Sequence, residues 1–189
     1  MSSNPQDDLA YVVSAVRRQD RPVGLPSIFF LWAVIIAIGF SMADWGSQFA
    51  GVFWLVAGIG GGALSWFLGA RAERRSGIRD VAEGRRYGLH WLVGGGAYVL
   101  TALPMFTGRV AAPVGATYYL LLTGLLYALA GIHLQRGLLP SGLICLVGFA
   151  VVTLVAVPYV WTVTGCIIAV ALVLAGLSAH RAIANGARA

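Results

Sequence analysis

Six long apolar stretches constrain the fold of this chain more than any other feature. Each is about 17 to 22 residues long, enough to cross a hydrocarbon core of roughly 30 Å at about 1.5 Å per residue. They cover residues 27–43, 49–70, 88–106, 115–134, 141–158 and 160–179. The sequence therefore predicts an all-α integral membrane protein built as a bundle of six helices.

The composition agrees with membrane insertion and argues against several functional classes. Of the 189 residues, 59% are hydrophobic and 11% are charged, whereas a soluble domain needs more charge to cover its surface. We divide the chain into an N-terminal segment, residues 1–22, and a transmembrane domain, residues 23–189. Little else lies outside the bilayer except one basic loop. We therefore expect a protein that is not an enzyme, has no cofactor and binds no nucleic acid.

The placement of the arginines predicts the orientation in the membrane. All 13 basic residues are arginine, and Arg109 alone falls on one side of the predicted bundle. The other side carries Arg17, Arg18, Arg21, Arg71, Arg74, Arg75, Arg79, Arg85, Arg86, Arg136, Arg181 and Arg188. The positive-inside rule then places both termini in the cytoplasm. The net charge of +6 also predicts attraction to anionic lipids at that face.

The N-terminal segment has the pattern of a short amphipathic helix on the cytoplasmic side. Its apolar stripe consists of Leu9, Val12, Val13 and Val16, spaced at i, i+3, i+4 and i+7. Such a helix lies on the inner leaflet, packs beneath the bundle or docks a cytoplasmic protein. These four residues are candidates for partner binding, together with Arg74 and Arg75 in the basic loop.

Ionisable residues are absent from the predicted spans, apart from histidine, cysteine and tyrosine. No acidic residue and no arginine falls within them, which disfavours a proton- or sodium-coupled carrier, because such groups usually mark ion pathways. His90, His133 and His180 all fall near the cytoplasmic interface and are weak candidates for metal or haem ligands if they converge. The alternative is isolated histidines that hydrogen-bond to lipid or water.

Hydroxyl groups within the third and fourth spans must find partners, because the bilayer core offers no water. Tyr98 and Tyr127 fall at comparable depths, with Thr101 and Thr123 nearby. We expect hydrogen bonds between the two helices; a substrate-binding role is the alternative.

The two cysteines are predicted to remain unpaired. Cys145 and Cys166 are offset by on the order of 15 Å along the membrane normal, whereas a disulfide requires Cα atoms within about 7 Å. We expect two buried free thiols.

Glycines within the spans predict close helix packing. Helix backbones can approach each other at Gly58-x-x-x-Gly62 and, on a neighbouring face of the same span, at Gly61, Ser65 and Gly69. Gly94, Gly95 and Gly96 in the third span and Gly124 in the fourth offer further contacts. The contact is either internal or between two molecules, and a narrow glycine-lined pore is a further alternative. The oligomeric state therefore stays open.

The six spans also group into three hairpins that resemble one another. The second helix of each hairpin ends in an arginine, at Arg71, Arg136 and Arg181. A repeated hairpin would explain this pattern. The alternative is that any membrane hairpin ends in an anchoring arginine.

The stretch DDLAYV at residues 7–12, followed by a glycine-bearing approach to the first span, resembles the opening of a group of small bacterial six-span inner-membrane proteins. The resemblance covers about the first forty residues. It implies a bacterial cytoplasmic membrane protein, and it implies no activity or functional residues.

Three functions follow as hypotheses. The first is a non-enzymatic regulatory or scaffolding role through the arginine-rich cytoplasmic face. The second is an uncoupled transporter or channel for a neutral or weakly polar solute. The third is histidine-ligated metal or haem binding.

Overall fold

The computed structural model describes residues 25–46, 48–76 and 81–186, and all regular secondary structure in these ranges is helical. The elements are α2 (Pro26–Asp44), α3 (Ala50–Ser76), α4 (Val81–Phe106), α5 (Ala112–His133), η1 (Arg136–Leu138), α6 (Leu139–Leu154) and α7 (Val160–Gly186). The predicted N-terminal helix, with Leu9, Val12, Val13 and Val16, lies outside the described residues.

The described part of the chain contains six helices long and apolar enough to cross a membrane, which confirms the predicted six-helix membrane bundle. The helix ends differ from the predicted spans. α6 ends at Leu154, before the predicted end at residue 158, because the backbone is extended at Val155 (φ −115°, ψ 122°). Pro158 also disfavours helix at the residue before it. At the other end of the bundle α3, α4 and α7 extend past their predicted spans.

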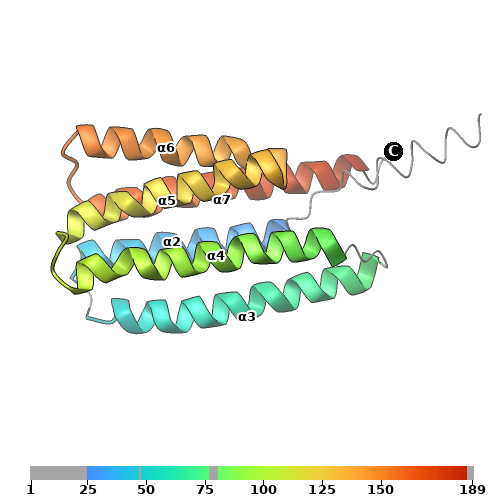
Figure 1. Cartoon of the computed structure of the whole chain (residues 1–189), viewed down its shortest axis with the longest axis horizontal. Helices are drawn as coiled ribbons and strands as arrows, with labels where there is room; N and C mark the ends of the chain where they lie inside the picture. Colours follow the sequence, from blue (N-terminus) through green and yellow to red (C-terminus); the bar gives the residue numbers. More distant parts are fainter. Residues whose placement is uncertain (1–24, 47, 77–80, 187–189) are drawn as a thin grey trace, which may run out of the picture.

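Four helices, α2, α5, α6 and α7, form the packed centre of the bundle (Figure 1). The most extensive interface lies between α2 and α7, and the next between α5 and α6. The largest fully buried side chains of this centre include Leu120, Leu138, Ile168 and Leu172. Glycine allows the close approach of α5 and α6, because a Cβ atom at Gly142 would collide with the Ala128 backbone.

The α3–α4 hairpin lies at the edge of this centre. α3 packs against α2 and α4 against α5, and the two hairpin helices make few contacts with each other. The largest interfaces therefore do not follow the three predicted hairpins, and the repeat stays a prediction.

The glycine contacts differ in part from those predicted. A Cβ atom at Gly58, Gly62 or Gly95 would meet no atom within 4 Å, so these glycines make no close helix contact within the described chain. The contacts lie one residue away, at Gly61 against α2 and at Gly94 against α5. An i, i+4 glycine pair shows that a close approach is possible but not which face makes it. At Gly124 the predicted packing is present, against α6.

A polar contact joins α2 to α7 at the end of the bundle that carries Arg109. The Asp44 carboxylate accepts a hydrogen bond of 2.7 Å from the Thr162 backbone N–H in the first turn of α7. First-turn amides have no partner within their own helix, and a negative charge is favoured at that position. Trp45 and Tyr159 stack beside this contact with ring centroids 5.5 Å apart.

Candidate functional site

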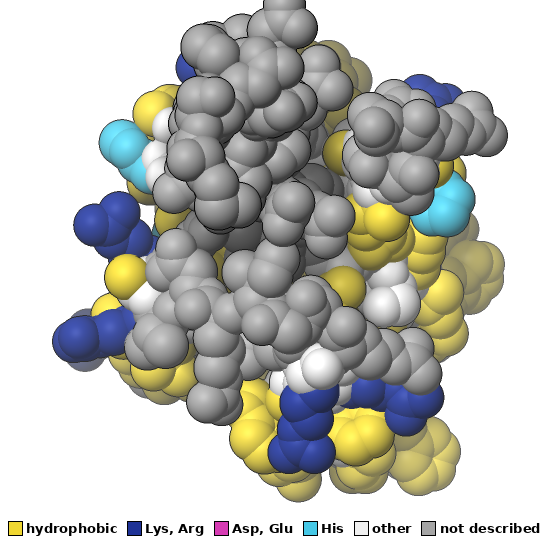
Figure 2. All heavy atoms as spheres, turned by 90° about the vertical axis from the view of Figure 1, so that its right-hand side faces the viewer, with side chains coloured by type: hydrophobic (Ala, Val, Ile, Leu, Met, Phe, Trp, Pro, Cys, Tyr) yellow, Lys and Arg dark blue, Asp and Glu magenta, His cyan; other side chains and the backbone are white. Residues whose placement is uncertain are grey.

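The opposite end of the bundle carries most of the described charge, and we call it the arginine-rich end. Its exposed basic side chains are Arg71, Arg74, Arg85, Arg86, Arg136 and Arg181. They come from α3, α4, the η1 turn and α7. Figure 2 looks onto this end and shows arginine side chains around the rim, beside hydrophobic side chains, with no acidic side chain visible among the described atoms.

The α3–α4 hairpin contributes four of these six arginines. Arg71 and Arg74 occupy the last turns of α3, where a cation interacts favourably with the helix dipole. Arg85 and Arg86 occupy the second turn of α4. None of the four guanidinium groups forms an ion pair with the described residues. The predicted partner-binding residue Arg75 also lies in α3, but its side chain is outside the described part.

The three histidines do not form a metal site. Within the described residues no three side chains of histidine, cysteine, aspartate or glutamate come together to hold a metal ion. His90 Nε2 lies 3.1 Å from the Leu126 carbonyl oxygen, a hydrogen bond between α4 and α5. His133 and His180 are exposed, and Figure 2 shows histidine side chains on opposite sides of this end. The convergence on which the metal or haem hypothesis depends is therefore wrong, although the common depth near this end was correct.

A polar network links α4 and α5 inside the bundle, and the sequence predicted hydrogen bonding between these two helices. The Tyr98 and Thr123 hydroxyl oxygens are 2.7 Å apart. Thr123 also donates to the Tyr119 carbonyl oxygen at 2.6 Å, and the Tyr119 hydroxyl lies 3.5 Å from the Tyr98 carbonyl oxygen. Thr101 instead donates to a carbonyl of its own helix. These bonds use the hydroxyl groups for helix association.

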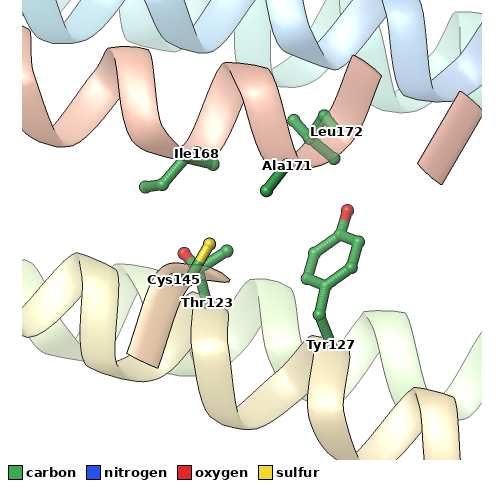
Figure 3. A pocket seen from close by; sticks show the side chains of 6 residues that line it. All are labelled: Thr123, Tyr127, Cys145, Ile168, Ala171 and Leu172. Carbon is green, nitrogen blue, oxygen red and sulfur yellow. The ribbon is translucent and has the colours of Figure 1, made fainter. Parts of the chain in front are cut away.

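The interior beside this network is closely packed. Figure 3 shows the space between α5, α6 and α7, lined by Thr123, Tyr127, Cys145, Ile168, Ala171 and Leu172. Its empty volume is about 120 Å³, and a water-sized probe finds no space within it. The other described depression is shallow and lies on the exposed side of α2. This space between α5, α6 and α7 therefore does not admit a solute in the present arrangement.

Two further findings concern Ser65 and the cysteines. Trp32 Nε1 donates a 3.0 Å hydrogen bond to Ser65 Oγ and so joins α2 to α3. Both cysteines are free, as predicted, but Cys166 is exposed on α7 whereas Cys145 is buried. The prediction that both thiols are buried was therefore wrong for Cys166, because apolar composition does not distinguish a lipid-facing position from a core position.

The sequence matches no protein-family model, no curated protein and no solved structure. The resemblance of residues 7–12 to small bacterial membrane proteins therefore stays a prediction.

Chemically, the arginine-rich end is suited to bind anions. Each guanidinium group has five N–H donors in a planar fork that matches carboxylate and phosphate oxygens. Such pairs are frequently bidentate, and their hydrogen bonds are stronger than those between neutral groups.

Proposed function

We propose that the protein is a non-enzymatic protein of the bacterial cytoplasmic membrane that regulates or scaffolds another protein through its arginine-rich end. In this proposal the arginine-rich end faces the cytoplasm, in line with the positive-inside rule. The partner is a cytoplasmic protein that presents an acidic surface. Its carboxylates pair with guanidinium groups that have no ion-pair partner among the described residues.

The charge difference between the two ends carries this proposal. Six exposed arginines lie at the arginine-rich end, whereas the described charges of the opposite end are Arg109 and Asp44. Asp44 already accepts a hydrogen bond from α7. Complementary charge speeds encounter with a partner and fixes its orientation, so the arginine-rich end is the favoured contact surface.

The close packing of the centre supports a role that does not depend on a path through the bundle. The space beside Thr123 and Tyr127 does not admit a water-sized probe. An uncoupled transporter or channel for a neutral solute is the alternative function, and it requires a second arrangement of the helices that opens such a path.

Affinity purification from native membranes into lipid nanodiscs tests the proposal. The full chain should bring a protein in fixed ratio, and mass spectrometry identifies it. Replacing the six arginines of the arginine-rich end by glutamine should release that protein, while the control Arg109→Gln should retain it. A bundle that purifies alone, or a partner that stays bound to the sixfold variant, refutes the regulatory reading and makes flux measurements in liposomes the next step.

A further inference from the structure

We propose that the end of the α3–α4 hairpin binds the phosphate of an anionic phospholipid through Arg71, Arg74, Arg85 and Arg86. This site goes beyond the proposed protein partner, because it names a second ligand for one part of the arginine-rich end. The two proposals share the placement of this end at the cytoplasmic leaflet and four of its six arginines, and the lipid measurement below contains no protein partner.

The hairpin carries two arginine pairs at the same end of the bundle, one on each helix. Arg71 and Arg74 are three residues apart in a helix, so their side chains leave α3 on the same face. The four residues 77–80 connect the end of α3 to the start of α4, which holds Ser76 and Val81 within roughly 18 Å. Arg85 and Arg86 follow in the second turn of α4. Arg136 and Arg181, in contrast, are the only described arginines of their own elements.

The depth of these arginines is that of lipid headgroups. The candidate span on α3 ends at Ala72 and that on α4 begins at Gly84, so Arg71, Arg85 and Arg86 lie just inside the ends of these spans and Arg74 lies just outside. Arginine side chains at such positions extend their charged groups towards the headgroups while their methylene stems cover apolar surface.

The surface just below the arginines is apolar and exposed, which favours an amphiphile over a soluble anion. On α3, Trp66 and Phe67 are 78% and 54% exposed. On α4, Leu92 and Val93 are 72% and 69% exposed. A phospholipid can contact both the arginines and the apolar surface below them, because its phosphate meets the guanidinium groups and its acyl chains meet the apolar side chains. A free phosphate or an acidic soluble protein would contact only the arginines.

The charge of the segment also favours an anionic ligand. Residues 71–86 contain six arginines and three acidic residues. Glu73 and Glu83 lie in the same helices, with side chains outside the described part. The segment therefore has a formal excess of three positive charges, six arginines less three acidic residues, which attracts an anionic headgroup.

Native mass spectrometry of the purified full chain with defined lipids tests the site. The probes are phosphatidylglycerol, phosphatidylcholine of the same chain length, and inorganic phosphate. Wild type should retain phosphatidylglycerol in preference to phosphatidylcholine. A basic residue near an anionic surface strengthens binding by about fivefold, so replacing all four arginines by glutamine should abolish the preference. The double variant Arg74→Gln/Arg86→Gln should reduce it by roughly 25-fold if the fourfold variant does not fold.

The control is Arg136→Gln/Arg181→Gln, which removes two arginines at the same end and should keep the preference. Equal loss in the control would overturn the site, because the effect would then reflect total charge. Retention of the preference in the double variant would overturn it as well. Displacement of the lipid by millimolar inorganic phosphate would assign the arginines to a free anion and refute the lipid ligand. The lipid measurement contains no protein partner, so its outcome does not depend on whether the proposed cytoplasmic partner exists.

Discussion

Adding one methyl group to a glycine should have opposite effects at two positions of this bundle. At Gly142 on α6, a Cβ atom would lie 2.7 Å from the Ala128 Cα atom and closer still to the Ala128 backbone nitrogen. Backbone atoms cannot move aside as a side chain can, so α5 and α6 must separate. At Gly62 on α3, a Cβ atom would meet nothing within 4 Å.

The expected magnitudes follow from two opposing terms. Replacing glycine by alanine in a helix stabilises it by up to about 1 kcal/mol. Overpacking costs typically about 1–3 kcal/mol and occasionally more, and the rigid backbone at Gly142 places that site at the upper end. We therefore expect Gly142→Ala to destabilise the protein by about 2 kcal/mol, from the overpacking cost less the helix gain. Gly62→Ala should leave its stability unchanged or raise it by up to about 1 kcal/mol.

Thermal unfolding of both variants and wild type in the same detergent measures the difference. For a chain of this length 1 kcal/mol corresponds to roughly 2–4 °C, so Gly142→Ala should lower Tm by about 4–8 °C. A Gly142→Ala protein that unfolds with wild type would refute the close contact between α5 and α6. A clear loss of stability in Gly62→Ala would show that another molecule packs on that face, and repeating the scan at lower protein concentration would test this.

Three further predictions concern polar groups. Thr123→Val should lower stability more than Tyr98→Phe, because it leaves the Tyr98 hydroxyl without its partner, whereas Thr123 keeps its bond to the Tyr119 carbonyl. In a thermal double-mutant cycle the two changes should show a coupling of about 0.6 kcal/mol. Additive effects would contradict the hydrogen bond. Asp44→Ala should lower the free energy of unfolding by about 1 kcal/mol. Asp44→Asn should lower it less, since the amide oxygen can still accept a hydrogen bond from the Thr162 N–H. Equal losses for the two variants in unfolding experiments would assign the effect to the charge rather than to the hydrogen bond. In the folded protein a lipid-soluble maleimide should react with Cys166 alone, and mass spectrometry should detect one label per chain. Two labels before unfolding would contradict the burial of Cys145.

The sequence predicted those features that depend on the kinds of residue in each helix. Apolar length predicted all six spans. The need to satisfy hydroxyl groups predicted hydrogen bonding between the third and fourth spans, although not which pair of residues would form it. Features that depend on which faces meet were not predictable. Gly61 and Gly94 make contacts that Gly58 and Gly95 do not, although neighbouring glycines are chemically alike. In lipid, exposed and buried faces are both apolar, so the hydrophobic pattern that orients a soluble helix is weak here.

The same reasoning applies to the candidate site. Residue positions predicted which end of the bundle would hold the arginines, because helix length and connection fix their depth. The histidines share a depth as predicted but differ in direction around the bundle axis, which no spacing along one helix determines.

The large interface between α2 and α7 has a consequence for biogenesis. α2 enters the membrane first among the described helices, whereas its main partner is synthesised last. Until α7 is inserted, α2 lacks its main protein partner, although Phe40 can already pack on Trp54 of α3 and Tyr119 of α5. The centre is therefore complete only once α7 is present: a chain that stops before α7 keeps the α5–α6 interface but lacks the most extensive interface of the bundle.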